Sequence, residues 1–284
     1  MIRLSRTIRF CVNPGATGAT PTHGLNGYAG RPPMQGLGRY YELHASVLGH
    51  VQPVTGYLVS IKTIDEAARA SAVPIVMQAC AETPTIDPAS LLPEMFGSLA
   101  QALPPEAQLA ELRFALTPTY SVSIEASDMT KAILRQQFDF AASHRLNAPE
   151  LSAEENKRVF GRCNNPNGHG HNYRVEPAVE VDVPAPGEQS ALTLQQLEQI
   201  TLEAIIDRYD HTHLNYDTPE FGEGTLNPSV ENMAKVFFHA LEPRVKDLSS
   251  GRAHLRSLTV WETDRTSSTY PADAIFSKSR PAPV

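Results

Sequence analysis

Apolar and polar residues alternate along two stretches in the middle of the chain. The first stretch is QQFDFAASHRL, from Gln136, and the second is HNYRVEPAVEVDV, from His171. Successive side chains of a strand point to opposite faces, so this alternation predicts two strands that each bury one face.

Two later stretches have helical spacing. In TLQQLEQITLEAIIDRY the apolar residues are Leu194, Leu197, Ile200, Ala204 and Ile205, which is the spacing of one helix face. SVENMAKVFFHAL begins with a serine, a residue type that often caps a helix. LRSLTVWETD and SSTYPA then predict a closing hairpin, so the second half is ordered strand, strand, helix, helix, strand, strand.

The first half repeats this order weakly. Phe10 matches Phe140 on the first strands, Pro88 matches Pro228 before a helix, and LRFALTPTY matches LRSLTVWETD. A repeat that keeps its order through several landmarks indicates tandem domains. We therefore predict an α+β fold of two domains, 1–130 and 131–284. Composition places loops at 13–38 and 184–190.

Composition excludes several classes of protein. The hydrophobic fraction of 41% allows sizeable cores, whereas the net charge of -7 argues against a nucleic-acid-binding protein. The sequence has no apolar run of membrane-spanning length and no apolar segment typical of a signal peptide near its start. Its three cysteines are widely spaced, which predicts free thiols. These features together predict a cytoplasmic protein.

Three histidines form a candidate metal site. His169 and His171 are two residues apart on a predicted strand, so both imidazoles point to one face. Antiparallel pairing with the preceding strand would bring His144 beside them. Three histidine ligands with an open fourth position are typical of catalytic zinc, although histidines also serve as surface or hydrogen-bonded residues.

Cys163 lies six residues before His169 in a loop rich in asparagine and glycine. A thiol beside a metal and a polar loop is expected to have a lowered pKa and to act as a base or nucleophile. The alternatives are a fourth zinc ligand or an inert thiol. We favour acid–base chemistry, because a fourth protein ligand would close the metal site.

Two further acidic positions have both a structural and a functional interpretation. Asp210 and His211 follow a predicted helix, where they could form a helix cap or a proton-transfer pair, and His213 could take either role. Glu262 lies on a predicted strand, where a glutamate usually faces solvent. Its functional interpretation is a carboxylate that accepts two hydrogen bonds from a guanidine-like edge.

These motifs, in this order, resemble the 6-pyruvoyl-tetrahydropterin synthase family across almost the whole second half. The matching segments are FDFAASHRL, LSAEENKRVFGRCNNPNGHGHNY, DH, VEN and ETD. The resemblance implies a tunnelling fold (T-fold), in which antiparallel sheets of several subunits form a β-barrel ringed by helices. It implies zinc on His144, His169 and His171, and a homo-oligomer with active sites at subunit interfaces.

The resemblance also implies the reaction, a phosphate lyase converting 7,8-dihydroneopterin triphosphate to 6-pyruvoyl-tetrahydropterin in tetrahydrobiopterin biosynthesis. Cys163 would be the base, Asp210 and His211 the proton relay, and Glu262 the pterin anchor. The alternatives are the 6-carboxy-tetrahydropterin synthase of the queuosine pathway and a non-catalytic pterin-binding protein. In the carboxy-forming relatives the thiol usually lies four residues before the first histidine, so the spacing of six favours the pyruvoyl product.

The first half lacks this chemistry. The alignment of the halves places Pro14, Leu37 and Arg39 at the three zinc ligands, and Thr119 at Glu262. The first domain is therefore predicted to be a degenerate copy of the T-fold without a metal site. Its candidate role is to supply strands to a closed barrel, which removes exposed sheet edges.

Overall fold

The computed structural model describes residues 1–15, 29–222 and 224–272. The chain forms two compact units. The first unit contains Met1–Leu134 and Val181–Ala191, and the second contains Arg135–Glu180 and the chain from Leu192 onward. The segment Val181–Ala191 thus belongs to the first unit, although it begins with the last two residues of a strand that otherwise lies in the second. The sequence analysis placed a single boundary near residue 130, whereas the first unit also includes this later segment.

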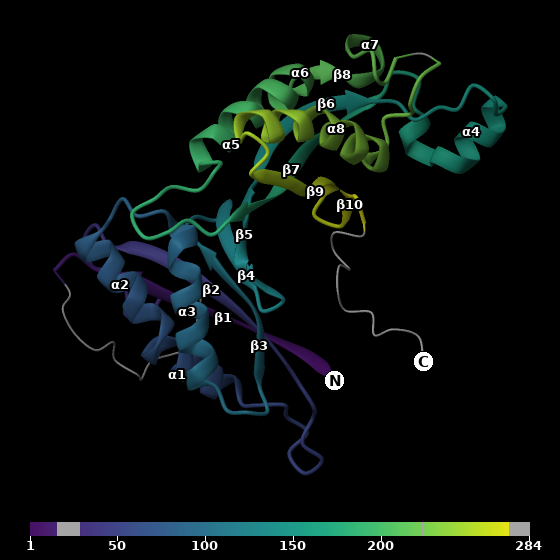
Figure 1. The fold of residues 1–284 in the computed structure, drawn as a ribbon. Coiled ribbons are helices and arrows are strands. Elements are labelled where there is room, and N and C mark those ends of the chain that lie inside the picture. Colours follow the sequence, from purple (N-terminus) through teal and green to yellow (C-terminus); the bar gives the residue numbers. More distant parts are fainter. Residues whose placement is uncertain (16–28, 223, 273–284) are drawn as a thin grey trace. The chain divides into compact units, whose positions relative to one another are not determined.

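The first unit is an antiparallel sheet with helices on one face (Figure 1). Its strands are ordered β1-β2-β3-β4-β5. Its elements are β1 Ile2–Val12, β2 Arg39–Gly49, α1 Ile61–Ala70, α2 Ala72–Glu82, α3 Pro88–Ala102, β3 Gln108–Ala115, β4 Tyr120–Glu125 and β5 Asp128–Gln136. Alternate strand residues, such as Phe10 and Leu43, are buried together with Leu92 and Met95 of α3.

Three helices stand where the internal repeat suggested two, because the first is interrupted at Ser71. Pro74 lies in the first turn of α2 and has no N–H to bond the carbonyl four residues back, so one continuous helix is disfavoured. β5 was not predicted either. It occupies the stretch in which the sequence placed the domain boundary. Part of the predicted 13–38 loop lies outside the described residues, and the 184–190 loop is present.

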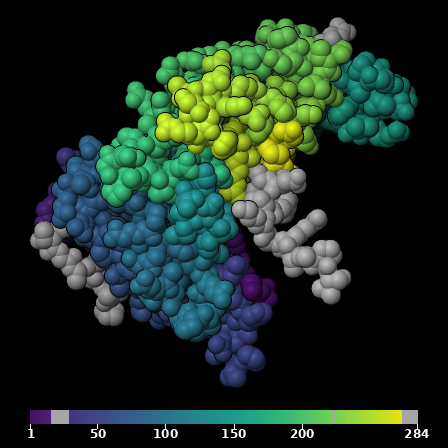
Figure 2. All heavy atoms as spheres, in the orientation of Figure 1, coloured from purple at the N-terminus to yellow at the C-terminus, as the bar shows by residue number. Residues whose placement is uncertain are grey.

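The second unit has the strand order β8-β6-β7-β9-β10. Its strands are β6 Phe138–His144, β7 His169–Asp182, β8 Thr212–His213, β9 Ala253–Thr263 and β10 Thr266–Tyr270. Its helices are α4 Ala153–Phe160, α5 Leu194–Thr201, α6 Asp207–Tyr209, α7 Leu214–Asp217 and α8 Val230–Leu248, with a 3-10 turn at Gly161–Asn164 and a π-helical turn at Leu202–Ile206. The helix α4 lies at one end of this unit (Figures 1 and 2).

The predicted order of the second half is confirmed, with local differences. Ser229 caps α8 by accepting a hydrogen bond from the Asn232 backbone N–H, as expected. The core forms where α8 packs on the sheet, with Phe237 against Phe140 at a ring-centroid distance of 5.8 Å. The helix predicted from Leu194 onward widens into the π-helical turn directly after Thr201, whose hydroxyl donates to the Leu197 carbonyl.

Candidate active site

Two antiparallel strands position the three histidines. In the β6–β7 ladder His144 lies directly opposite His169, and His171 lies opposite Ala142. The rings of His169 and His171 are 4.7 Å apart between centroids, and the His144 ring lies 4.7 Å from that of His169. One ligand atom from each imidazole lies within 4.8 Å of the other two. The predicted convergence of the three histidines is therefore present.

Hydrogen bonding sets the direction of the His144 imidazole. Its Nδ1 lies 2.7 Å from the Pro228 carbonyl oxygen, which can only accept, so this nitrogen carries the proton. The other nitrogen, Nε2, is left with its lone pair directed at His169 Nε2, 3.3 Å away. A backbone carbonyl that fixes the tautomer in this way is a common second partner of a metal-binding histidine.

Burial favours the neutral form of two of the three imidazoles. It lowers the pKa of His144 to about 4, an effect that the neighbouring histidines reinforce and the Pro228 bond opposes. Burial also lowers the pKa of His171, against the influence of Glu262. Neutral imidazoles are the form that binds a metal. Among the described residues, the buried His171 Nε2 has no hydrogen-bond partner, so the donor set fits a metal ion.

Glu262 reaches this cluster from β9. Its Oε1 lies 3.6 Å from His144 Nε2 and 3.5 Å from His171 Nε2, and the side chain is only 19% exposed. A glutamate on a strand usually faces solvent, but the Glu262 side chain points to the histidine cluster instead. The carboxylate adds a negative charge directly beside the imidazoles of His144 and His171.

Cys163 lies in the 3-10 turn that follows α4, and the Leu146 N–H donates to its carbonyl at 2.8 Å. The expected lowering of its pKa concerns a thiol beside a bound metal ion and stays a prediction. Burial raises the pKa of this thiol, and the charge of Glu262 raises it further. The candidate metal ligands and the polar loop are visible in the sequence near Cys163, whereas the carboxylate of Glu262 comes from β9, far along the chain.

Asp210 and His211 form the expected pair at 2.9 Å between Asp210 Oδ2 and His211 Nδ1. The Ala141 N–H donates to Asp210 Oδ1 at 2.8 Å, and this bond, together with His211, lowers the pKa of Asp210. The His211 side chain is 83% exposed. It borders an open hollow that His171 and Gly170 also line. The pair is thus anchored at the edge of β6 and presents its imidazole outward.

Two residues near the cluster were missed or underrated. Tyr173 follows His169 and His171 on the same strand face, and its fully buried hydroxyl has no partner in the described part of the chain. The i, i+2, i+4 spacing could have indicated it. His213 was considered only as a substitute in the Asp–His pair. Both of its ring nitrogens are buried and unpartnered within the described ranges.

The first unit lacks a counterpart of this cluster among its described residues. Leu37, aligned with His169, is 93% exposed. Arg39, aligned with His171, forms side-chain hydrogen bonds with Tyr41 and Cys80. Across the described residues, no helix is long and apolar enough to cross a membrane.

Comparison with known proteins places the second unit in a family. Residues 133–273 match the profile described as 6-pyruvoyl tetrahydropterin synthase. The human 6-pyruvoyl tetrahydrobiopterin synthase is 38% identical over 144 residues, 50% of this chain and 93% of that protein. The Poecilia reticulata protein of the same name is 43% identical over 103 residues, 34% of this chain and 69% of that protein.

Among solved structures, the Caenorhabditis elegans 6-pyruvoyl tetrahydropterin synthase has 32% sequence identity and a TM-score of 0.44. The match covers 49% of this chain and 94% of that one. Since a relative at 38% identity is matched over almost its whole length, the chain belongs to the 6-pyruvoyl tetrahydropterin synthase family.

Proposed function

We propose that the second unit is a lyase that converts 7,8-dihydroneopterin triphosphate to 6-pyruvoyl-tetrahydropterin and releases triphosphate. The observation that carries the proposal is the convergence of three imidazoles and one carboxylate. It occurs in a chain of which 144 residues are matched at 38% identity by the human protein named 6-pyruvoyl tetrahydrobiopterin synthase. The conversion needs no redox cofactor, because the electrons lost by the substrate side chain reduce its ring.

The metal proposed for the cluster is zinc, held by the Nε2 atoms of His144, His169 and His171. Three imidazoles suit zinc, and the Pro228 carbonyl already fixes the tautomer that leaves His144 Nε2 unprotonated. When bound, zinc makes the substrate's side-chain hydroxyls more acidic and offsets the Glu262 charge that keeps Cys163 protonated.

Glu262 and Cys163 are assigned to the substrate's two ends. The Glu262 carboxylate would accept two hydrogen bonds from the ring N3–H and 2-amino group of the pterin, which have the geometry of a guanidine edge. Cys163 would remove a proton from the side-chain carbon. Its partly exposed position in the turn after α4 leaves the thiol accessible to a ligand.

Asp210 and His211 would relay protons as the ring is reduced. Asp210 orients the imidazole at 2.9 Å, and the Ala141 N–H holds the carboxylate in its charged form. Because His211 is 83% exposed, we propose that it serves the site of a neighbouring chain in a homo-oligomer. A cytoplasmic location stays a prediction from the sequence.

The test is to incubate the purified, zinc-loaded chain with 7,8-dihydroneopterin triphosphate and to identify the product by mass. A pyruvoyl product supports the proposal, and a carboxy product assigns the chain to the alternative reaction. Absence of any product in both the zinc-loaded and the freshly purified protein refutes both. Protein stripped by a chelator is the control, and it should be inactive until zinc is returned.

A further inference from the structure

The first unit contains a cavity unrelated to the histidine cluster. Its volume is about 760 Å³, within the roughly 300–1,000 Å³ typical of small-molecule sites. It lies between the first half of β1, the segment Gly56–Ser60 and the first turns of α1, with Arg31 at its wall. The proposed lyase chemistry uses none of these residues.

The lining is cationic in an acidic protein. Arg6, Arg31 and Lys62 face two carboxylates, Asp65 and Glu66, whereas the whole chain carries a net charge of -7. One of the two carboxylates is already neutralised twice, because Asp65 binds Arg69 as well as Arg6. A local excess of positive charge around a cavity favours an anionic ligand.

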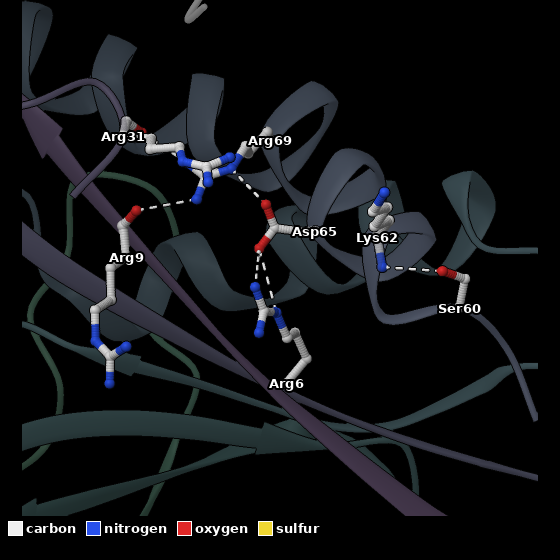
Figure 3. A network of polar contacts seen from close by, with 7 residues as sticks. All are labelled: Arg6, Arg9, Arg31, Ser60, Lys62, Asp65 and Arg69. Carbon is white, nitrogen blue, oxygen red and sulfur yellow. Dashed lines mark hydrogen bonds and ion pairs between the residues drawn. The ribbon is translucent and has the colours of Figure 1, made fainter. Parts of the chain in front are cut away.

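Asp65 holds the Arg6 guanidinium of the lining in place, and Arg69, which lies outside the lining, in turn holds Asp65 (Figure 3). Arg6 and Arg69 reach Asp65 from two sides, at 3.1 Å to Oδ1 and 2.8 Å to Oδ2. Arg69 also donates to the carbonyl oxygens of Arg31 at 2.7 Å and Arg9 at 3.1 Å. These bonds tie α1 to β1 and to the Arg31 backbone, so the wall of the cavity requires little reordering to receive a ligand.

The positive charge of Lys62 does not stabilise the helix in which it lies. It lies in the first turn of α1, which contains no acidic residue. The positive end of the helix dipole is there, so a cation at that position is unfavourable for the helix. Ser60 already caps the turn by accepting from the Lys62 N–H. The lysine is therefore not explained by helix stability, but an anion in the adjacent cavity would account for it.

The mouth of the cavity is apolar. Ile2, Tyr57 and Ile61 line it and are 44%, 64% and 45% exposed. A lining that combines arginine and lysine with aromatic and aliphatic side chains suits a ligand with a charged head and an apolar body. We propose that this cavity, named here the β1–α1 cavity, binds a small organic phosphate with an aromatic or apolar body.

Phenyl phosphate is a suitable probe, and isothermal titration calorimetry on the full chain measures its affinity. We expect the Lys62→Gln change to weaken binding at least tenfold. It should leave the melting temperature of the unliganded protein unchanged or slightly higher, because the unfavourable helix charge is removed. Tyr57→Ala should weaken phenyl phosphate but not inorganic phosphate.

Two control variants separate this site from other phosphate-binding positions. Lys131→Gln removes a lysine of the same unit that pairs with Asp182 outside the cavity, and it should bind phenyl phosphate like the unchanged protein. His171→Asn alters the histidine cluster and should also bind normally. Equal affinity in Lys62→Gln, loss of binding in His171→Asn, or no binding to the unchanged protein would each overturn the proposal. None of these readouts depends on turnover.

Discussion

Tyr173 has a buried hydroxyl at the centre of the candidate site. Its ring stacks on Phe140 with centroids 5.1 Å apart and meets the His171 ring edge-on at 5.4 Å. Burial and the charges of Glu262 and Cys163 raise its pKa, so the phenol keeps its proton. A buried donor without a partner costs about 1–3 kcal/mol. The proposed function supplies a reason for that cost, namely a hydrogen bond to bound substrate.

We expect Tyr173→Phe to lower turnover while leaving the fold intact. Loss of one substrate hydrogen bond should reduce kcat/KM by about tenfold, whereas removal of the unsatisfied hydroxyl should hold or raise the melting temperature. Steady-state kinetics and thermal unfolding measure the two effects. Tyr209→Phe, at another buried tyrosine of the same unit, is the control and should turn over normally. A fall in stability with unchanged kcat/KM would assign Tyr173 a purely structural role.

The burial of His144 makes stability depend on pH. Its pKa falls from 6.5 to about 4 on folding, mainly because the ring is desolvated. Between these values the unfolded chain binds a proton that the folded chain excludes, so stability decreases as pH falls through the window. In metal-free protein this group should contribute a loss of on the order of 3 kcal/mol, measurable by denaturant unfolding at successive pH values.

His144→Asn is the matched control for that pH dependence. It should show a shallower loss, with a remainder from His171 and His44, whose pKa values burial also lowers. A variant that loses stability as steeply as the unchanged protein would show that His144 is not the group responsible.

For individual residues, the sequence predicted the geometry correctly where the pairing of two neighbouring strands alone determines the positions of the side chains. The H-x-H spacing and one antiparallel register were sufficient to bring the histidines together. The pKa of Cys163 depends on Glu262, which β9 delivers from about a hundred residues further along the chain. No local pattern encodes such a contact, so the sign of this shift could not be predicted.

Among the elements, α3 begins at a buried junction. Asp87 accepts from the Ala89 N–H at 2.9 Å as the N-cap of the helix, and from the Ser190 N–H at 2.7 Å. Its side chain thus joins α3 to the returning segment Val181–Ala191 within the first unit. Asp87 is only 8% exposed, so water cannot readily replace either bond.

We expect Asp87→Ala to destabilise the chain by about 2–4 kcal/mol, because it removes a helix cap and leaves a buried N–H unpaired. Urea unfolding measures the change. Ser60→Ala, which removes the exposed cap of α1, is the comparison and should cost roughly 0.5–1 kcal/mol. Equal losses in the two variants would mean that the Ser190 bond contributes nothing.

Periodic patterns identified the elements with one clear face and missed those without one. The alternation of β6, β7 and β9 was sufficient for their prediction. β5 was missed because its buried apolar residues Ala132, Ile133 and Leu134 are consecutive and give no alternation. α4 was missed although it has a complete capping box from Ser152 to Glu155, because only one of its residues is buried. A short helix that buries little apolar surface has only a weak periodic pattern of apolar residues, so the sequence does not reveal it.

For the whole molecule, the cluster of three histidines occurs once among the described residues, in the second unit. The proposed relay is attached to the same unit but faces outward, since His211 is 83% exposed while its partner Asp210 is fixed to β6. An imidazole presented in this way can serve a site on another chain. In the proposed homo-oligomer, the assembly rather than the single chain would therefore be the unit of activity.

Mixing two inactive variants tests that arrangement. Cys163→Ala and His211→Ala should each lose turnover with zinc content unchanged, because neither residue belongs to the proposed ligand set. If the relay of one chain acts on the thiol of another, co-refolded mixtures regain activity, since random pairing of equal amounts yields about a quarter intact sites. Each variant refolded alone is the control. Persistent inactivity of a mixture shown by mass spectrometry to contain both chains would place Cys163 and His211 in the same chain's site, and the outward imidazole would then have to turn inward when substrate binds.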